Sequence, residues 1–471
     1  MPRIEIPPTI SVNAWTGSKA PTSPLPASAL IWGLSRRSAG RTSDERLLLP
    51  RVIDDRNWRD ENVGWGLVLP DNPGLGPKVL AGATDAPEPL QRLVASRNNA
   101  PVFRYLPAAQ DGYLRRYSGD AYQDFSLVGS KAGIKPGCLP RYLLLYGNPD
   151  VIPWSFQYAA NFTHYVGRLD LEGEELNRYI DALISDWNGM HTNPRAPIVW
   201  SVNHGHPDIT WLMEETISKE LDKAFENDPD SDLSQHRGLF GADANLASLM
   251  DTLVTNSPSL VITTSHGMTG PFDDQPKMVG QLGNMVDTNR DVLDSGQLIG
   301  RWDPNGAIWY SHACCSAGSD APSCYADLLD PASDVTAMLK GVASVSGKRV
   351  APLPRKLLGA EKPLRAFIGH VEPTFDWTLR DPETGQPLSA TLREALYDRL
   401  FQADRPPLGW AMAKIFDDAS NMLGLWGASI AAVNRNAPKA REWALYRQLT
   451  ALDRQHTVLL GDPTVSLPAM S

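Results

Sequence analysis

A histidine and a pair of adjacent cysteines are the residues best suited to covalent chemistry in this sequence. His266 follows one short apolar run, and Cys314 and Cys315 follow a later one. A cysteine thiolate attacks a carbonyl carbon when a base lies within reach, and histidine is a common base for this purpose. The pattern therefore predicts acyl transfer by His266 and Cys315, with no cofactor and no metal.

Small residues beside both reactive side chains could supply the hydrogen-bond donors that acyl transfer needs. Negative charge develops on the carbonyl oxygen during the reaction, and backbone N–H groups stabilise it where no bulky side chain blocks them. Gly267 follows the histidine directly, and Ser316, Ala317 and Gly318 follow Cys315. We expect the N–H groups of Gly267 and Cys315 to bind this oxygen.

Composition narrows the possible partners. The 471 residues include 44 Lys and Arg against 54 Asp and Glu, a formal net charge of −10. Nucleic-acid binding needs a basic face, so no nucleic acid is expected as a partner. The sequence has no signal-peptide pattern and no membrane-spanning run, so no membrane partner is expected either. A chain of this length with 4 cysteines is no disulfide scaffold, which favours a cytoplasmic location.

Strand and helix patterns alternate from residue 76 onwards, as in an α/β sandwich around a mainly parallel sheet. The runs 141–147 and 260–264, for example, are typical of short buried strands. Functional residues of such sheets lie just beyond the carboxyl ends of strands, where His266 and Cys315 fall. We expect an irregular N-terminal segment (1–75), an N-terminal α/β subdomain (76–160) and a catalytic domain (161–471).

These motifs resemble the caspase-like clan of cysteine peptidases (clan CD), and within it the gingipain-type peptidases most closely. His-Gly after one strand, with a cysteine loop 49 residues further on (315 − 266 = 49), is the signature of the clan. Val-Gly-Arg at 166–168 and Gly-Asp-Pro at 461–463 resemble two further gingipain landmarks. The resemblance implies a caspase-like α/β/α sandwich that cleaves protein substrates as a cysteine endopeptidase.

The resemblance leaves two cysteines as candidate nucleophiles. Ala313-Cys314 matches the Ala-Cys pattern of some relatives. The segment 315–318 matches the Cys-x-x-Gly pattern of gingipains, legumains and metacaspases. We favour Cys315 because the glycine spacing controls the oxyanion turn, and Cys314 is the alternative.

The resemblance also implies a substrate pocket. In gingipain-type peptidases, an acid after the strand that follows Val-Gly-Arg meets a basic side chain before the scissile bond, and Asp208 lies in the matching stretch. We expect Asp208 to favour Arg or Lys through charge-assisted hydrogen bonds; the alternative is a plain helix N-cap. Phe375 or Trp377, beyond the strand at 364–373, could form an aromatic pocket wall, with ordinary packing as the alternative.

Two other functions stay as alternatives. His204-x-His206-x-Asp208 resembles part of a zinc-hydrolase motif, although Ile209 stands where a further histidine is expected. A non-catalytic caspase-like scaffold is the second. Relatives of the preferred type act in bacterial defence or cell death and cut partners such as gasdermin-like pore formers. By that analogy we expect regulated proteolysis, with an activating or inhibitory partner.

Overall fold

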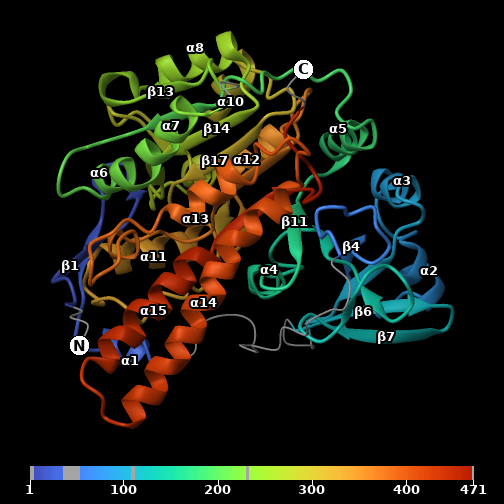
Figure 1. Ribbon diagram of the computed structural model, residues 1–471, viewed down its shortest axis with the longest axis horizontal. Coiled ribbons are helices and arrows are strands. Elements are labelled where there is room, and N and C mark those ends of the chain that lie inside the picture. The colour runs from blue at the N-terminus through green and yellow to red at the C-terminus, as the bar shows by residue number, and fades with distance from the viewer. Residues whose placement is uncertain (1–4, 35–52, 108–111, 230–232, 469–471) are drawn as a thin grey trace.

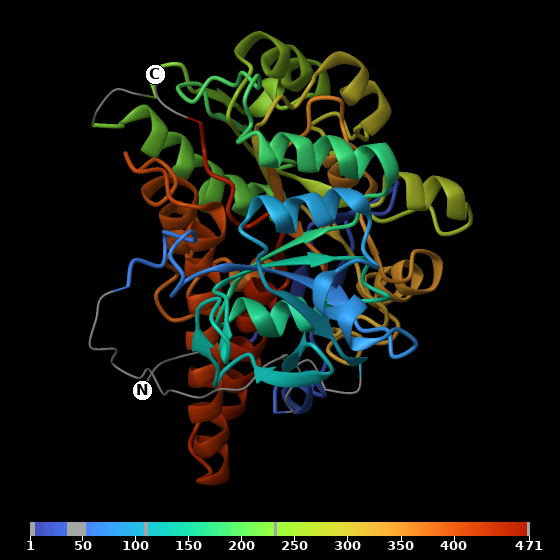
Figure 2. The same cartoon turned by 90° about the vertical axis from the view of Figure 1, so that its right-hand side faces the viewer.

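A sheet of 12 strands crosses the whole molecule, with helices on both of its faces (Figures 1 and 2). The computed structural model describes residues 5–34, 53–107, 112–229 and 233–468. The strand order is β13-β12-β14-β17-β20-β21-β11-β10-β4-β5-β6-β7. Most neighbouring strands are parallel, so the predicted α/β/α sandwich around a mainly parallel sheet is confirmed, and it is consistent with a caspase-like arrangement.

The sheet consists of two parallel halves that run in opposite directions. One half contains β13 (Arg237–Leu239), β12 (Ile198–Ser201), β14 (Leu260–Thr264), β17 (Ile308–His312) and β20 (Ala366–His370). The other contains β21 (Thr457–Gly461), β11 (Tyr165–Leu169), β10 (Tyr142–Tyr146), β4 (Trp65–Pro70) and β5 (Val102–Tyr105). The antiparallel pair β20–β21 joins them. The carboxyl ends of the two halves therefore lie at opposite edges of the sheet.

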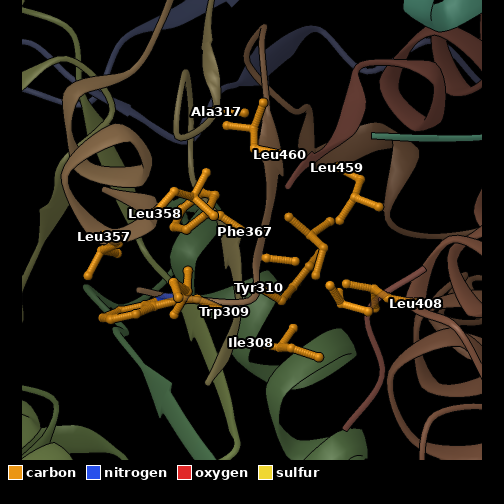
Figure 3. Packing of buried hydrophobic residues seen from close by; sticks show 14 of the residues in the cluster. Ile308, Trp309, Tyr310, Ala317, Leu357, Leu358, Phe367, Leu408, Leu459 and Leu460 are labelled. Atoms are coloured by element: carbon orange, nitrogen blue, oxygen red, sulfur yellow. The ribbon is translucent and has the colours of Figure 1, made fainter. Parts of the chain in front are cut away.

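Continuous apolar sequence explains the middle strands. Every residue of β14, β17 and β20 is buried, as expected for parallel strands covered on both faces. Figure 3 shows this core, in which residues of β17, β20 and β21 pack with residues of two helices. These helices are α12 (Pro352–Leu358) and α14 (Leu408–Asn434). The hairpin of β6 (Tyr113–Ser118) and β7 (Ala121–Ser126) forms the far end of the sheet.

Helices of moderate length connect the strands, and α14 lies beside α15 as the longest helical pair (Figure 1). No helix among the described residues is both long enough and apolar enough to cross a membrane. The remaining helices of three or more turns, and those near the strand ends, are α3 (Glu88–Ser96), α4 (Trp154–Asn161), α5 (Gly173–Ile184), α6 (Ile209–Met213), α7 (Lys219–Glu226), α8 (Leu246–Asn256), α9 (Gln275–Gln281), α10 (Ser295–Arg301), α11 (Asp334–Val345) and α15 (Ala440–Gln455).

The N-terminal strands at residues 9–24 lie against the half of the sheet that comes much later in the sequence. The strands involved are β1 (Thr9–Ser11), β2 (Ala14–Trp15) and β3 (Thr22–Pro24). Strand β2 forms a small sheet with β15 (His266–Met268) and β16 (Met285–Val286). Figure 1 shows β1 and β4 on opposite sides of the molecule. Residues 1–4 and 35–52 lie outside the described residues, and the predicted division at 75 and 160 stays a prediction.

Candidate active site

The histidine and cysteine loops lie at the same edge of the sheet. Strands β14 and β17 are parallel neighbours, so the segments that follow them leave the sheet side by side. A Cβ atom added at Gly267 would lie 1.9 Å from the carbonyl oxygen of Cys314. Backbone cannot yield that much space, so a glycine after His266 is what allows the two loops to meet.

His266 is fully buried and is held through one ring nitrogen only. Its Nε2 lies 2.9 Å from Oδ2 of Asp208. Its Nδ1 is buried and has no hydrogen-bond partner among the residues that the structure describes. An imidazole fixed on one side and unpartnered on the other can pass a proton to or from a bound molecule.

Asp208 caps a helix and contacts the histidine at the same time. Its Oδ1 accepts hydrogen bonds from the backbone N–H and the hydroxyl of Thr210, at the start of α6. Burial raises the pKa of the Asp208 carboxyl. The hydrogen bond and positive charge of His266 and the hydrogen bonds from Thr210 lower it by more, so the pKa of Asp208 lies below the usual range. Asp208 therefore acts as a helix N-cap, as the alternative interpretation expected. A role of Asp208 as the acid of a substrate pocket stays a prediction.

Two further rings lie beside the histidine. The ring centroid of His204 is 5.7 Å from that of His266, with an angle of 11° between the planes. The ring of Trp15, from the N-terminal strand β2, is 6.1 Å from the same imidazole. Burial, followed by the proximity of His266, lowers the pKa of His204. These rings restrict the orientation of the imidazole. The sequence pointed to His204 only as a possible zinc ligand, and it did not point to Trp15.

The cysteines form one buried turn. Their Sγ atoms are 3.5 Å apart, and the exposed fractions of Cys314 and Cys315 are 0% and 2%. Cys315 has a φ of +55°, a left-handed conformation that non-glycine residues adopt rarely and that tends to occur at functional turns. Burial raises the pKa of the Cys314 thiol, and the hydrogen bond with the Cys315 thiol raises it further. Cys314 is therefore a thiol rather than a thiolate in this conformation.

Two backbone donors converge between the loops. The N–H groups of Gly267 and Cys314 both donate to the carbonyl oxygen of Asn13, over N···O distances of 2.8 and 3.2 Å. Paired N–H groups on one carbonyl oxygen are the arrangement that stabilises an oxyanion. The sequence predicted Gly267 together with the amide of Cys315, whereas the donor that meets Gly267 here is the amide of Cys314. No motif in the sequence pointed to Asn13.

A small cavity lies next to the cysteine turn. Cys315 lines it together with two carboxyl groups, Asp320 and Glu372, and with Ser323. The Ser323 hydroxyl donates to Glu372 over 2.9 Å. Burial raises the pKa of Glu372 to about 8 and also raises the pKa of Asp320. Both carboxyls would gain from a cation in this cavity, and neither was predicted as a site residue.

The predicted aromatic wall lies elsewhere. Trp377 is partly buried and packs its ring against Tyr446, with ring centroids 5.4 Å apart. Phe375 is fully buried, and its ring packs against Tyr325. Neither residue lines the cavity beside Cys315. The structure thus brings together Asp208, His266, Gly267 and the cysteine turn, and places Trp377 against Tyr446, so its role in substrate binding stays a prediction.

The fragment of a zinc motif does not form a metal centre. Asp208 is held by His266, and the ring of His206 packs edge-on against Trp211. Among the described residues, no group of 3 or more His, Cys, Asp or Glu side chains is placed to hold a metal ion. The donor set of the zinc-hydrolase alternative is therefore not assembled.

A second pair of histidines lies at the same edge of the sheet. His312 and His370 are buried at the ends of β17 and β20, and their rings are joined over 3.1 Å from Nε2 of His370 to Nδ1 of His312. The hydroxyls of Tyr310 and Thr374 are the other partners of His312. Burial lowers the pKa of His370 to about 3, and it lowers the pKa of His312 as well. Both rings are neutral parts of the core.

Comparisons with known proteins identify no family for this chain. No family model matches the sequence, and no curated protein matches it. One solved structure, described as "Structure of Protease", is similar with a TM-score of 0.47 and 13% sequence identity. The match covers 87% of this chain and 79% of that chain. A likeness at this level supports no conclusion about activity, so the function must be argued from the site itself.

Proposed function

We propose that this chain is a cysteine endopeptidase that acts through His266 and the cysteine turn. The observation that carries the proposal is the convergence of two backbone donors on a peptide carbonyl beside a histidine with an unpartnered Nδ1. Peptide-bond hydrolysis through a thioester needs a nucleophile, an acid–base and oxyanion donors. Residues of all three kinds lie at this edge of the sheet.

The reaction follows from these positions. His266 takes the thiol proton as the cysteine sulfur attacks the carbonyl carbon of the substrate, and the N–H groups of Gly267 and Cys314 bind the oxygen as it becomes negative. His266 then gives this proton to the leaving amine as the C–N bond breaks. Water, which loses a proton to His266, attacks the thioester, and the proton returns to the cysteine sulfur as the C–S bond breaks. Asp208 acts as a positioning residue that holds the imidazole and stabilises its protonated form.

The choice between the cysteines rests on opposing observations. Cys315 fits the Cys-x-x-Gly pattern, has the strained backbone and lines the cavity, so it stays our first candidate. The amide of Cys314 lies in the donor pair, which favours Cys314. Cys314→Ala and Cys315→Ala should separate the two. The nucleophile's variant should lose about 10³-fold or more in kcat/KM, and the other should stay active.

A preference for Arg or Lys before the scissile bond is better supported by the cavity than by Asp208. Asp208 has both oxygens engaged within the protein, whereas the buried carboxyl of Glu372 lines the cavity beside Cys315, and no ion pair of Glu372 is present among the described residues. Asp320 lines the same cavity but is partly exposed, and Nζ of Lys348 lies 3.9 Å from its Oδ1. Glu372→Gln should lower kcat/KM for basic substrates selectively. Asp208→Asn should lower it for all substrates equally. The reverse pattern would return the pocket role to Asp208.

A peptide library offered to the wild type and to His266→Ala tests the proposal. The assay should be run both before and after the chain is cut near Gly17, because Asn13 occupies the two donors in the intact chain. Cleavage that is lost in His266→Ala is expected. No cleavage by either form, and no reaction of the cysteines with a peptidyl chloromethylketone, would favour the non-catalytic scaffold. A role in defence or cell death, with a gasdermin-like substrate, rests on the sequence resemblance alone.

A further inference from the structure

The N-terminal segment 10–15 passes between the histidine and cysteine loops. On one side, β2 pairs in parallel with β15, and Ala14 faces Gly267 in the register. On the other side, Val12 forms an antiparallel bridge with Phe375. The Asp376 carboxyl also accepts a hydrogen bond from the backbone N–H of residue 11. The segment is thus an extended peptide held through its backbone on both sides, which is how clefts bind peptides.

Asn13 is the residue at the centre of this passage. Its carbonyl oxygen fills the position between the N–H groups of Gly267 and Cys314. Its side chain is fully buried, and Oδ1 accepts a hydrogen bond from the backbone N–H of Thr374 over 3.0 Å. A substrate of the proposed peptidase would present its scissile carbonyl and the preceding side chain in the same two places.

The segment is extensively buried, but one of its buried polar groups has no hydrogen-bond partner among the described residues. Ile10, Val12 and Ala14 are fully buried in the same apolar cluster as the two cysteines. Nδ2 of Asn13, however, is buried and has no hydrogen-bond partner among the described residues. A buried donor without an acceptor is unfavourable, because it has lost its hydrogen bonds to water and gained none in the protein. A ligand that the site must later release tolerates this imperfect fit better than a permanent core strand would.

We infer that residues 10–15 are an internal, substrate-like ligand of this site, with Asn13 in the place of the residue before the scissile bond. The inference rests on the proposed function and names the first occupant of its substrate cleft. While the segment is in place, no second carbonyl can reach the two N–H donors. The intact chain is therefore closed to other peptides, and displacement of the segment opens it.

The experiment cuts the chain beside the segment. The loop at Gly17 and Ser18 is exposed, so a recognition sequence for a specific protease can be inserted there. After cleavage, fragment 1–17 is held by non-covalent contacts and can be removed by exchange in mild denaturant. The same sequence inserted at exposed Gly385, where an added Cβ would meet nothing within 4 Å, gives the matched control.

The readout is the rate at which iodoacetamide alkylates Cys314 and Cys315, followed by peptide mapping. Removal of fragment 1–17 should raise this rate about tenfold or more, because residues 10–15 no longer cover the two cysteines. Synthetic peptide 1–17 in excess should restore the slow rate, and the cut at Gly385 should leave the rate unchanged. Equal rates in both cut proteins would overturn the inference.

If circular dichroism shows that the cut protein is unfolded, a second variant tests the inference instead. In the uncut chain, Asn13→Gly removes the contact with Thr374, and Ser18→Gly is the control. Faster alkylation only in Asn13→Gly supports the inference, and equal rates overturn it. Peptide hydrolysis measured in the same samples separates the two levels. Faster alkylation without hydrolysis contradicts the peptidase function, whereas hydrolysis that is equally fast with the segment in place contradicts only the internal ligand.

Discussion

Two buried histidine sites share one edge of the sheet, yet they differ in their partners. His266 follows β14 and bonds to the carboxylate of Asp208, 2.9 Å away. His312 and His370, at the ends of the next two strands, bond to each other and to hydroxyl groups. Arg454 adds a positive charge near the pair and helps to lower both pKa values. Burial is similar at the two sites, so the neighbouring charge is the main difference.

The comparison separates a histidine that can act from histidines that only pack. A carboxylate on one ring nitrogen stabilises an imidazolium and fixes the ring, as acid–base catalysis requires. Hydroxyl partners and a nearby guanidinium fix the ring but do not stabilise an imidazolium, so the His312–His370 pair stays neutral across the physiological range. Position at a strand end is therefore not sufficient for function, and the partner decides it.

The largest expected effect is on activity. His266→Ala should lower kcat/KM for peptide cleavage about 10³-fold or more, because it removes the proposed acid–base. His370→Gln should stay within about threefold of the wild type, because its ring touches no reacting group. The measurement is steady-state cleavage of one peptide by the wild type and both variants after the cut at Gly17 and removal of fragment 1–17. A loss in His370→Gln as large as that in His266→Ala would erase the distinction between the two sites.

The residue after each histidine sharpens the contrast. Gly267 has no room for a Cβ beside Cys314, whereas the residue after His312 is already a buried alanine. Gly267→Ala should therefore separate the two loops, lower the free energy of unfolding by about 2 kcal/mol or more, and abolish cleavage. Gly280→Ala, in an open part of α9, should be neutral or slightly stabilising. Urea titrations of both variants provide the test, and equal midpoints would contradict the close contact.

Removal of the Asp208 carboxylate should make His266 resemble the His312–His370 pair, because its imidazolium would no longer have a negatively charged partner. Asp208→Asn keeps the N-cap oxygen but loses the charge, so kcat should fall about 10- to 100-fold on every substrate with little change in KM. The pH profile should also shift, because the imidazolium loses its counter-charge. A rise in KM confined to basic substrates, with kcat unchanged, would instead identify a pocket acid.

A different kind of effect concerns stability in acid. Burial lowers the pKa of His370 to about 3, so below the unfolded value of about 6.5 the unfolded chain takes up a proton that the folded chain refuses. The free energy of unfolding should fall between these values by about 1.4 kcal/mol per pH unit for this residue. His370→Gln should reduce that slope relative to the wild type, because the unfolded variant has no imidazole at this position to take up a proton. Urea unfolding at several pH values measures both slopes, and identical slopes in both proteins would contradict a neutral core pair.

The sequence predicts the parts of the site that depend on local pattern. Apolar runs ending in His-Gly and in a cysteine turn place both groups at the carboxyl ends of strands, and the parallel sheet confirms that placement. Local pattern does not give the direction of β21, which reverses the sheet beside β20. That reversal depends on a strand whose own sequence reads the same in either orientation.

Contacts between distant segments account for what the sequence could not predict. Asp208 was considered as a pocket acid or a cap, and nothing near it in the sequence reveals that its second oxygen meets His266. Asn13 is more than two hundred residues from every group that it contacts, in a segment without periodic pattern. Glu372 reads as part of a strand end until the fold sets it beside Cys315. Each contact requires the closed fold before it exists.

The position of strand β21 in the sequence affects the order in which the sheet can form. It lies between β11 and β20, and without it each of these strands would present an open edge. β21 comes after all the other strands of the sheet in the sequence. During synthesis the two halves of the sheet therefore cannot unite until the ribosome has made the residues around 460. The half that carries His266 and the cysteines is complete in sequence before that point, and its strand β20 remains an open edge until β21 has been made.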